Sequence, residues 1–130
     1  MPKLPHWSIL RMVEKAPVSV IETPEFISAT GRMMDEEERA VLVDYLAYNP
    51  AAGDVIPGTG GVRKLRWALP GRGKRGGARV IYFFHSAAMP LFALTAFAKN
   101  QRADLSQADR NGFRDLTARL KEAYLKRSTS

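Results

Sequence analysis

The chain contains no cysteine among its 130 residues, which excludes a disulfide framework, a thiolate nucleophile and a zinc site built on cysteine. It also lacks any apolar run close to the roughly 20 residues that span a bilayer. The first 16 residues contain two prolines and no uninterrupted apolar core, so they do not have the pattern of a secretory signal. We therefore expect a cytoplasmic protein with no membrane partner, in which a disordered leader at 1–16 precedes a single domain at 17–127.

Negative charge is missing from the middle of the chain. No Asp or Glu stands between Asp54 and Asp104, whereas residues 55–103 contain nine Lys and Arg. The rest of the chain has 11 Lys and Arg against 13 Asp and Glu, so the net charge of +7 originates in this central segment. A basic segment without carboxylates is typical of a surface that binds a phosphate backbone, and it predicts a nucleic-acid ligand.

The same lack of carboxylates argues against a metal-dependent nuclease. Such enzymes hold their ions with clustered carboxylates or histidines, and His85 is the one histidine of the basic segment. We therefore expect no metal ion and no cofactor.

Apolar and β-branched residues predict four strands, at residues 18–22, 63–69, 78–85 and 91–98. Short connections between the last three favour an antiparallel meander. Arg79, Ile81 and Phe83 share one face of the third strand, because side chains alternate along a strand.

Helix start signals predict helices both before and after these last three strands. Pro24 suits the first turn of one helix, Asp35 caps a second with Glu38 at the capping-box position, and Ser106 caps the last. Four residues of the second helix recur at helical spacing and predict its buried stripe: Val41, Leu42, Tyr45 and Leu46. The predicted fold is α+β, with N-terminal helices and a C-terminal helix on a twisted, mostly antiparallel four-stranded sheet.

Glycine-rich segments at 58–61 and 71–77 have the composition of phosphate-binding loops but not their motif. A P-loop lysine is followed by Ser or Thr, whereas Lys74 is followed by Arg75. We interpret both segments as turns in which glycine permits positive φ.

Three motifs occur in a fixed order: GTGGVRKLR at 58–66, GKRGGAR at 73–79, and KN at 99–100 followed by DLS at 104–106. Together they resemble the HigB-like branch of the RelE toxin superfamily, over roughly residues 18–125. The resemblance implies a RelE-like fold and the toxin of a type II toxin–antitoxin module. It also implies an endoribonuclease that cuts mRNA in the ribosomal A site, with mRNA on the ribosome and a cognate DNA-binding antitoxin as partners.

Candidate site residues follow from these motifs and from the chemistry of RNA cleavage without metal, in which the 2′-OH of the substrate attacks. Arg79 is the candidate for stabilising the phosphorane, since a guanidinium stays charged and donates bidentate hydrogen bonds. Lys74 or Lys99 is the candidate for proton transfer, because neighbouring cations lower a lysine pKa from about 10.4. Six further residues are expected to contact RNA: Arg63, Lys64, Arg66, Arg72, Arg75 and Asn100.

Two other side chains are weaker candidates for proton transfer. Tyr82 and His85 are explained more simply by packing in or beside the sheet. Phe97 stands where the family often has a tyrosine. A phenylalanine at this position would preserve base stacking but not the acid–base chemistry of a phenol. Because the sequence offers no clear general base, one alternative remains a non-catalytic basic module that binds RNA or DNA, as a degenerate toxin. A structural ribosome-associated protein would explain the charge as well.

Overall fold

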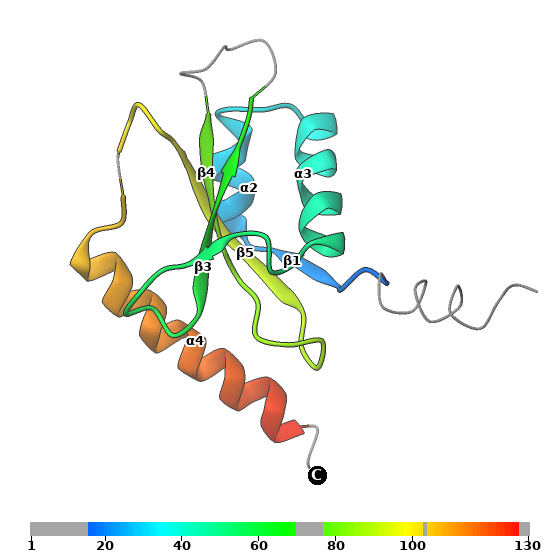
Figure 1. Ribbon diagram of the computed structural model, residues 1–130, viewed down its shortest axis with the longest axis vertical. Coiled ribbons are helices and arrows are strands. Elements are labelled where there is room, and N and C mark those ends of the chain that lie inside the picture. Colours follow the sequence, from blue (N-terminus) through cyan, green and yellow to red (C-terminus); the bar gives the residue numbers. More distant parts are fainter. Residues whose placement is uncertain (1–15, 70–76, 103, 128–130) are drawn as a thin grey trace, which may run out of the picture.

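A computed structural model describes residues 16–69, 77–102 and 104–127, the side chain of 127 excepted. Along the chain the elements are β1 (Val20–Glu22), α2 (Pro24–Gly31), α3 (Glu36–Tyr48), β2 (Asp54–Val55), β3 (Val62–Trp67), β4 (Ala78–Phe83), β5 (Leu91–Ala98) and α4 (Gln107–Arg127). The described residues thus form an α+β fold, in which helices cover a sheet on both sides (Figure 1).

The sheet has the strand order β1-β5-β4-β3-β2. β1 runs parallel to β5, and the remaining neighbours are antiparallel. The prediction of a mostly antiparallel sheet is confirmed, but the number of strands was wrong. A fifth strand, β2, pairs Asp54 with Lys64 and Val55 with Arg63. Two residues are too short a stretch to show an alternating pattern, so the sequence carried no signal for this strand.

Each helix begins at a residue that the sequence marked. Thr23 Oγ1 accepts a hydrogen bond from the Phe26 amide at 3.2 Å, and Pro24 opens α2. Asp35 Oδ1 accepts from the Glu38 amide at 2.8 Å to start α3. At α4 the bonds are reciprocal: Ser106 Oγ accepts from the Asp109 amide, and Asp109 Oδ2 accepts from the Ser106 amide, both at 3.1 Å. This exchange is a capping box.

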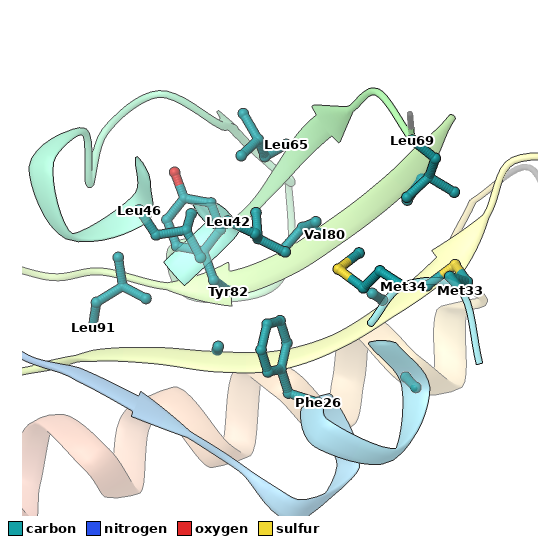
Figure 2. Packing of buried hydrophobic residues seen from close by; sticks show 14 residues of the cluster. Phe26, Met33, Met34, Leu42, Leu46, Leu65, Leu69, Val80, Tyr82 and Leu91 are labelled. Carbon is teal, nitrogen blue, oxygen red and sulfur yellow. The ribbon is translucent and has the colours of Figure 1, made fainter. Parts of the chain in front are cut away.

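Alternation along β4 divides the core into two clusters. Val80 and Tyr82 point to the side covered by α2 and α3, where the Tyr82 ring lies beside Leu42 and Leu46 (Figure 2). Ile81 and Phe83 point to the opposite side. There Phe113, Leu120 and Tyr124 of α4 pack against the second cluster.

The predicted stripe of α3 is half right. Leu42 and Leu46 are fully buried, but Val41 is 61% exposed and Tyr45 is 39% exposed. α3 contacts the sheet through a narrow face, and Tyr45 lies at its border, with its ring 5.4 Å from that of Trp67. The spacing of the four apolar residues also fits a wider buried stripe. The sequence therefore could not separate the buried pair, Leu42 and Leu46, from the exposed pair, Val41 and Tyr45; only the packing of α3 on the sheet does so.

The GTGG segment is a turn that holds α4 against the sheet. Thr59 is fully buried, and its Oγ1 donates to the Ile56 carbonyl at 2.6 Å and accepts from the Val62 amide at 3.1 Å. Thr117 of α4 donates its hydroxyl to the Thr59 carbonyl at 3.0 Å. Gly60 has φ +77°, and a Cβ there would lie 2.3 Å from Thr117 Oγ1. The interpretation of this segment as a turn is confirmed, whereas residues 71–76 of the second glycine segment lie outside the described residues.

Candidate nucleic-acid interface

A row of three side chains crosses the sheet from β3 to β5 on the face that α4 packs against. The strand register puts Arg66 of β3 directly opposite Arg79 of β4, and Arg79 opposite Phe97 of β5. Arg79 shares its face with Ile81 and Phe83, as the alternation predicted. We call Arg66, Arg79 and Phe97 the cross-strand row.

The two arginines of this row have no carboxylate partner in the described part of the chain. Arg79 Nη1 donates only to the carbonyl of its neighbour Ala78, at 3.3 Å. Arg66 is exposed and forms no hydrogen bond or ion pair with another described residue. Like charges directly opposite each other destabilise a sheet, and a bound anion would remove that repulsion. The pair therefore has the electrostatics of a phosphate site.

Lys64, by contrast, is tied to Asp104 at the start of α4. Lys64 Nζ lies 3.4 Å from Asp104 Oδ1, and Arg110 Nη2 lies 3.2 Å from Asp104 Oδ2. The Leu105 amide donates to Asp104 Oδ1 at 2.8 Å. This amide bond is the main reason why the pKa of Asp104 is lowered, and Lys64 and Arg110 lower it further.

Sequence reasoning missed both Asp104 and Arg110. The DLS motif marked Asp104 as part of a family pattern, but its contact with Lys64 joins residues 40 positions apart. No local signal reports such a contact, because it depends on how α4 docks.

Phe97 is covered by a neighbouring cation. The residue is only 6% exposed, and the Arg102 guanidinium lies over its ring at 5.0 Å from the centroid, a cation–π contact. Arg102 also forms an ion pair with Asp109, whose pKa is lowered first by that hydrogen bond and then by the Ser106 amide. A base cannot stack on Phe97 while Arg102 stays in this position.

A cavity of about 430 Å³ lies between β2, β3 and the beginning of α4. Its lining combines apolar side chains with Asp54, Lys64, Arg66, Asp104 and Arg110. Because Arg66 belongs to both, the cavity adjoins the cross-strand row.

The residues predicted to contact RNA do not all lie on the same face of the sheet. Lys64, Arg66 and Arg79 share one face of the sheet. Arg63 points to the opposite face, where its Nη1 donates to the Gly53 carbonyl at 2.7 Å and the Ala51 carbonyl at 3.2 Å.

Lys99 and Asn100 are exposed directly after β5. The Lys99 amide donates to the Gly77 carbonyl at 3.1 Å, so its backbone lies near the start of β4. Three further predicted residues lie outside the described part of the chain: Arg72, Lys74 and Arg75.

The weaker candidates for proton transfer do not reach the cross-strand row. Tyr82 is fully buried on the α3 side, where its hydroxyl accepts a hydrogen bond from the Gly53 amide at 2.8 Å. Burial is the main cause of its raised pKa. His85 is exposed after β4, with its ring stacked near Phe83 at 6.5 Å between centroids.

Among the described residues, no group of three or more His, Asp or Glu side chains is arranged to hold a metal ion. Within the same residues, no helix has the length and apolar character needed to cross a membrane.

A family model described as the RelE toxin of the RelE/RelB toxin–antitoxin system matches residues 53–128. The matched segment is more than half of the chain and contains β2 to β5 and α4. It therefore includes the cross-strand row, the GTGG turn and the Asp104 ion pairs. This chain belongs to the RelE toxin family.

Proposed function

We propose that the protein is the toxin of a type II toxin–antitoxin module and that it cuts mRNA in the ribosomal A site without a metal ion. The observation that carries the proposal is the Arg66–Arg79 pair, in which two guanidiniums oppose each other without a carboxylate from the described residues. An RNA phosphate would supply the missing negative charge. Family membership supports the toxin assignment, and the motifs at 58–66 and 73–79 favour the HigB-like branch.

The proposed reaction uses the 2′-OH of the RNA as nucleophile. The 2′-oxygen bonds to the adjacent phosphorus, the bond from phosphorus to the 5′-oxygen breaks, and the products are a 2′,3′-cyclic phosphate and a 5′-hydroxyl. One proton leaves the 2′-OH and one joins the 5′-oxygen. Arg79, with Arg66 opposite, donates hydrogen bonds to the non-bridging oxygens as their charge increases in the phosphorane.

The candidates for proton transfer in this reaction are two lysines, Lys99 and Lys74. Lys99 has its backbone fixed near the start of β4 by the bond to Gly77, and Lys74 belongs to the connection between β3 and β4. Lys64 is held by Asp104, so we assign it to RNA binding rather than to proton transfer. Arg72, Arg75 and Asn100 add charge and donors for the RNA backbone.

Such a site needs help from the ribosome. Holding the codon in line for attack contributes about 7–11 kcal/mol to catalysis in well-oriented reactions. Among the described residues of the toxin there is no group of three His, Asp or Glu side chains that could hold a metal ion, and the cross-strand row contains no histidine. Free RNA is therefore a poor substrate.

The proposed partners follow from this mode of action. They are mRNA on the ribosome and a cognate DNA-binding antitoxin that blocks the basic face or keeps the toxin off the ribosome. Both place the protein in the cytoplasm.

One observation favours a different function, a basic module that binds RNA or DNA without cutting it. Among the described residues, neither aromatic candidate offers acid–base chemistry at the cross-strand row: Tyr82 points to the other side of the sheet, and Phe97 has no hydroxyl. A module of this kind would bind nucleic acid in a salt-dependent way and would not be toxic.

Cleavage of a message in a reconstituted translation reaction, mapped by primer extension, separates the two functions. We expect cuts within translated codons for the natural sequence and at least about a 100-fold lower rate for Arg79→Ala, because one preorganised donor to the transition state is lost. Arg66→Ala should reduce the rate less. Arg119→Ala, at an exposed position of α4, is the control and should cut normally.

Two results would contradict the nuclease. One is undiminished cutting by Arg79→Ala. The other is a folded, antitoxin-free protein that leaves translated messages intact, and this result would favour the binding module. Efficient cutting of naked RNA would instead contradict the ribosome dependence.

A further inference from the structure

The cavity beside the cross-strand row has the size and position of a nucleotide subsite. Its volume of about 430 Å³ lies within the range of about 300–1,000 Å³ that is usual for small-molecule sites. Arg66 lines the cavity and also stands opposite Arg79. A phosphate between the two arginines would therefore place its attached nucleoside at the cavity mouth.

The cavity wall supplies an apolar surface for a flat ring. Ile56 is a buried side chain of this wall, and Pro57 extends it to the edge of the sheet. Apolar walls with a few polar groups are the usual composition of a ligand pocket.

Of the two carboxylates in the cavity, only Asp54 is available to a ligand. Asp104 already accepts hydrogen bonds from Lys64, Arg110 and the Leu105 amide. Asp54 stands directly opposite Lys64 across the β2–β3 ladder. Its carboxylate nevertheless forms no hydrogen bond or ion pair with any residue in the described ranges.

From this arrangement we propose that the cavity binds the base of a nucleotide next to the scissile phosphate, with a preference for guanine. This inference rests on the proposed function, because it names part of the substrate of the same site. The Watson–Crick edge of guanine presents two adjacent N–H donors, at N1 and N2, followed by the acceptor O6. The two oxygens of Asp54 match the donors, and the ammonium of Lys64, its cross-strand neighbour, matches O6.

The other bases fit this pair less well. Adenine and cytosine each place an acceptor nitrogen beside the amino group, and a carboxylate repels it. Uracil has a single N–H between two carbonyl oxygens. A bidentate contact to the right base discriminates by about 5- to 150-fold, and the exposure of Asp54 argues for the lower end of that range.

The first experiment measures binding of single nucleotides to the full-length protein without ribosomes. Amide chemical shifts are followed during titration with 5′-GMP, 5′-AMP, 5′-CMP and 5′-UMP, none of which contains a bond that the proposed reaction cuts. We expect about tenfold tighter binding of 5′-GMP, with shifts at Asp54, Val55 and Lys64.

Two variants of Asp54 test the assignment of the carboxylate. Asp54→Asn and Asp54→Ala should abolish the preference for 5′-GMP, and both should fold because Asp54 is exposed on a two-residue edge strand. Asp115→Asn, on the exposed surface of α4, is the matched control and should keep it. Equal binding of all four nucleotides by the natural sequence would overturn the subsite, and so would a preference that survives in both Asp54 variants.

A cleavage map over many translated codons separates this proposal from the proposed function. Cuts enriched next to guanine, with the enrichment lost in Asp54→Asn, would support both. Cuts without base preference would overturn the subsite and leave the nuclease standing. Selective binding of 5′-GMP by a protein that never cuts would support the subsite and contradict the nuclease.

Discussion

At the scale of single residues, Tyr82 shows how a polar group is used inside the core. Its ring packs between the sheet and α3, while its hydroxyl meets the backbone amide of Gly53. Gly53 has no room for a side chain, since a Cβ there would lie 2.9 Å from the Tyr82 ring. The hydroxyl therefore fixes the loop that leads into β2, and with it the position of Asp54.

Removing this hydroxyl should cost stability. Tyr82→Phe leaves the buried Gly53 amide without its partner, and we expect the free energy of unfolding to fall by about 1–3 kcal/mol, measured by urea denaturation. Tyr48→Phe is the control, because Tyr48 is 57% exposed and should unfold like the natural sequence. Equal stability of the two variants would mean that water replaces Tyr82 at Gly53.

At the scale of elements, α4 is held by the turn before β3 as well as by its own apolar face. Gly60→Ala would place a methyl group against Thr117 at a positive φ. We expect a loss of about 2 kcal/mol or more, with weaker protection of α4 amides in hydrogen exchange.

Gly112→Ala is the matched control within α4 itself. A Cβ at Gly112 meets nothing within 4 Å, and alanine in a helix is favoured over glycine by about 1 kcal/mol. This variant should therefore be more stable than the natural sequence. Destabilisation by Gly112→Ala would show that the helix is packed differently around this position.

The beginning of α4 should also respond to acid. The pKa values of Asp104 and Asp109 are both lowered, so each adds stability that is present above its ordinary value of 3.8 and is lost as pH falls through its lowered value. Both carboxylates are about 40% exposed, so solvent screens the effect. The melting temperature should fall below pH 4, and less so in the double variant Asp104→Asn and Asp109→Asn. An identical acid slope in the two proteins would contradict this assignment.

At the scale of the whole molecule, local sequence signals predicted where the helices and strands lie. They did not predict the contacts between residues that are far apart in the sequence. Asp35 and Ser106 marked helix starts because capping bonds reach only three residues ahead. The alternation of side chains correctly grouped Arg79 with Ile81 and Phe83. It did not reveal that Arg63 bonds to backbone carbonyls on the other face, because alternation does not say which face of a strand stays open.

The site could be predicted as a basic region but not as a geometry. The opposition of Arg66 and Arg79 depends on strand register, and a shift by one residue would turn every side chain to the other face. The partnership of Lys64 with Asp104 depends on the docking of α4. Composition identified the excess charge, whereas tertiary structure decides which cations are neutralised and which remain available.

The separation of charge across the sheet has a kinetic consequence. Glu36, Glu37 and Asp44 lie exposed on α3, on the side of the sheet opposite the Arg66–Arg79 pair. A molecule with one acidic and one basic side is turned by the field of a polyanion before contact is made. Productive encounters with a ribosome-sized polyanion would therefore be frequent even at low protein concentration. As the salt concentration is raised, the association rate would fall first, and the stability of the final complex would fall only at higher salt.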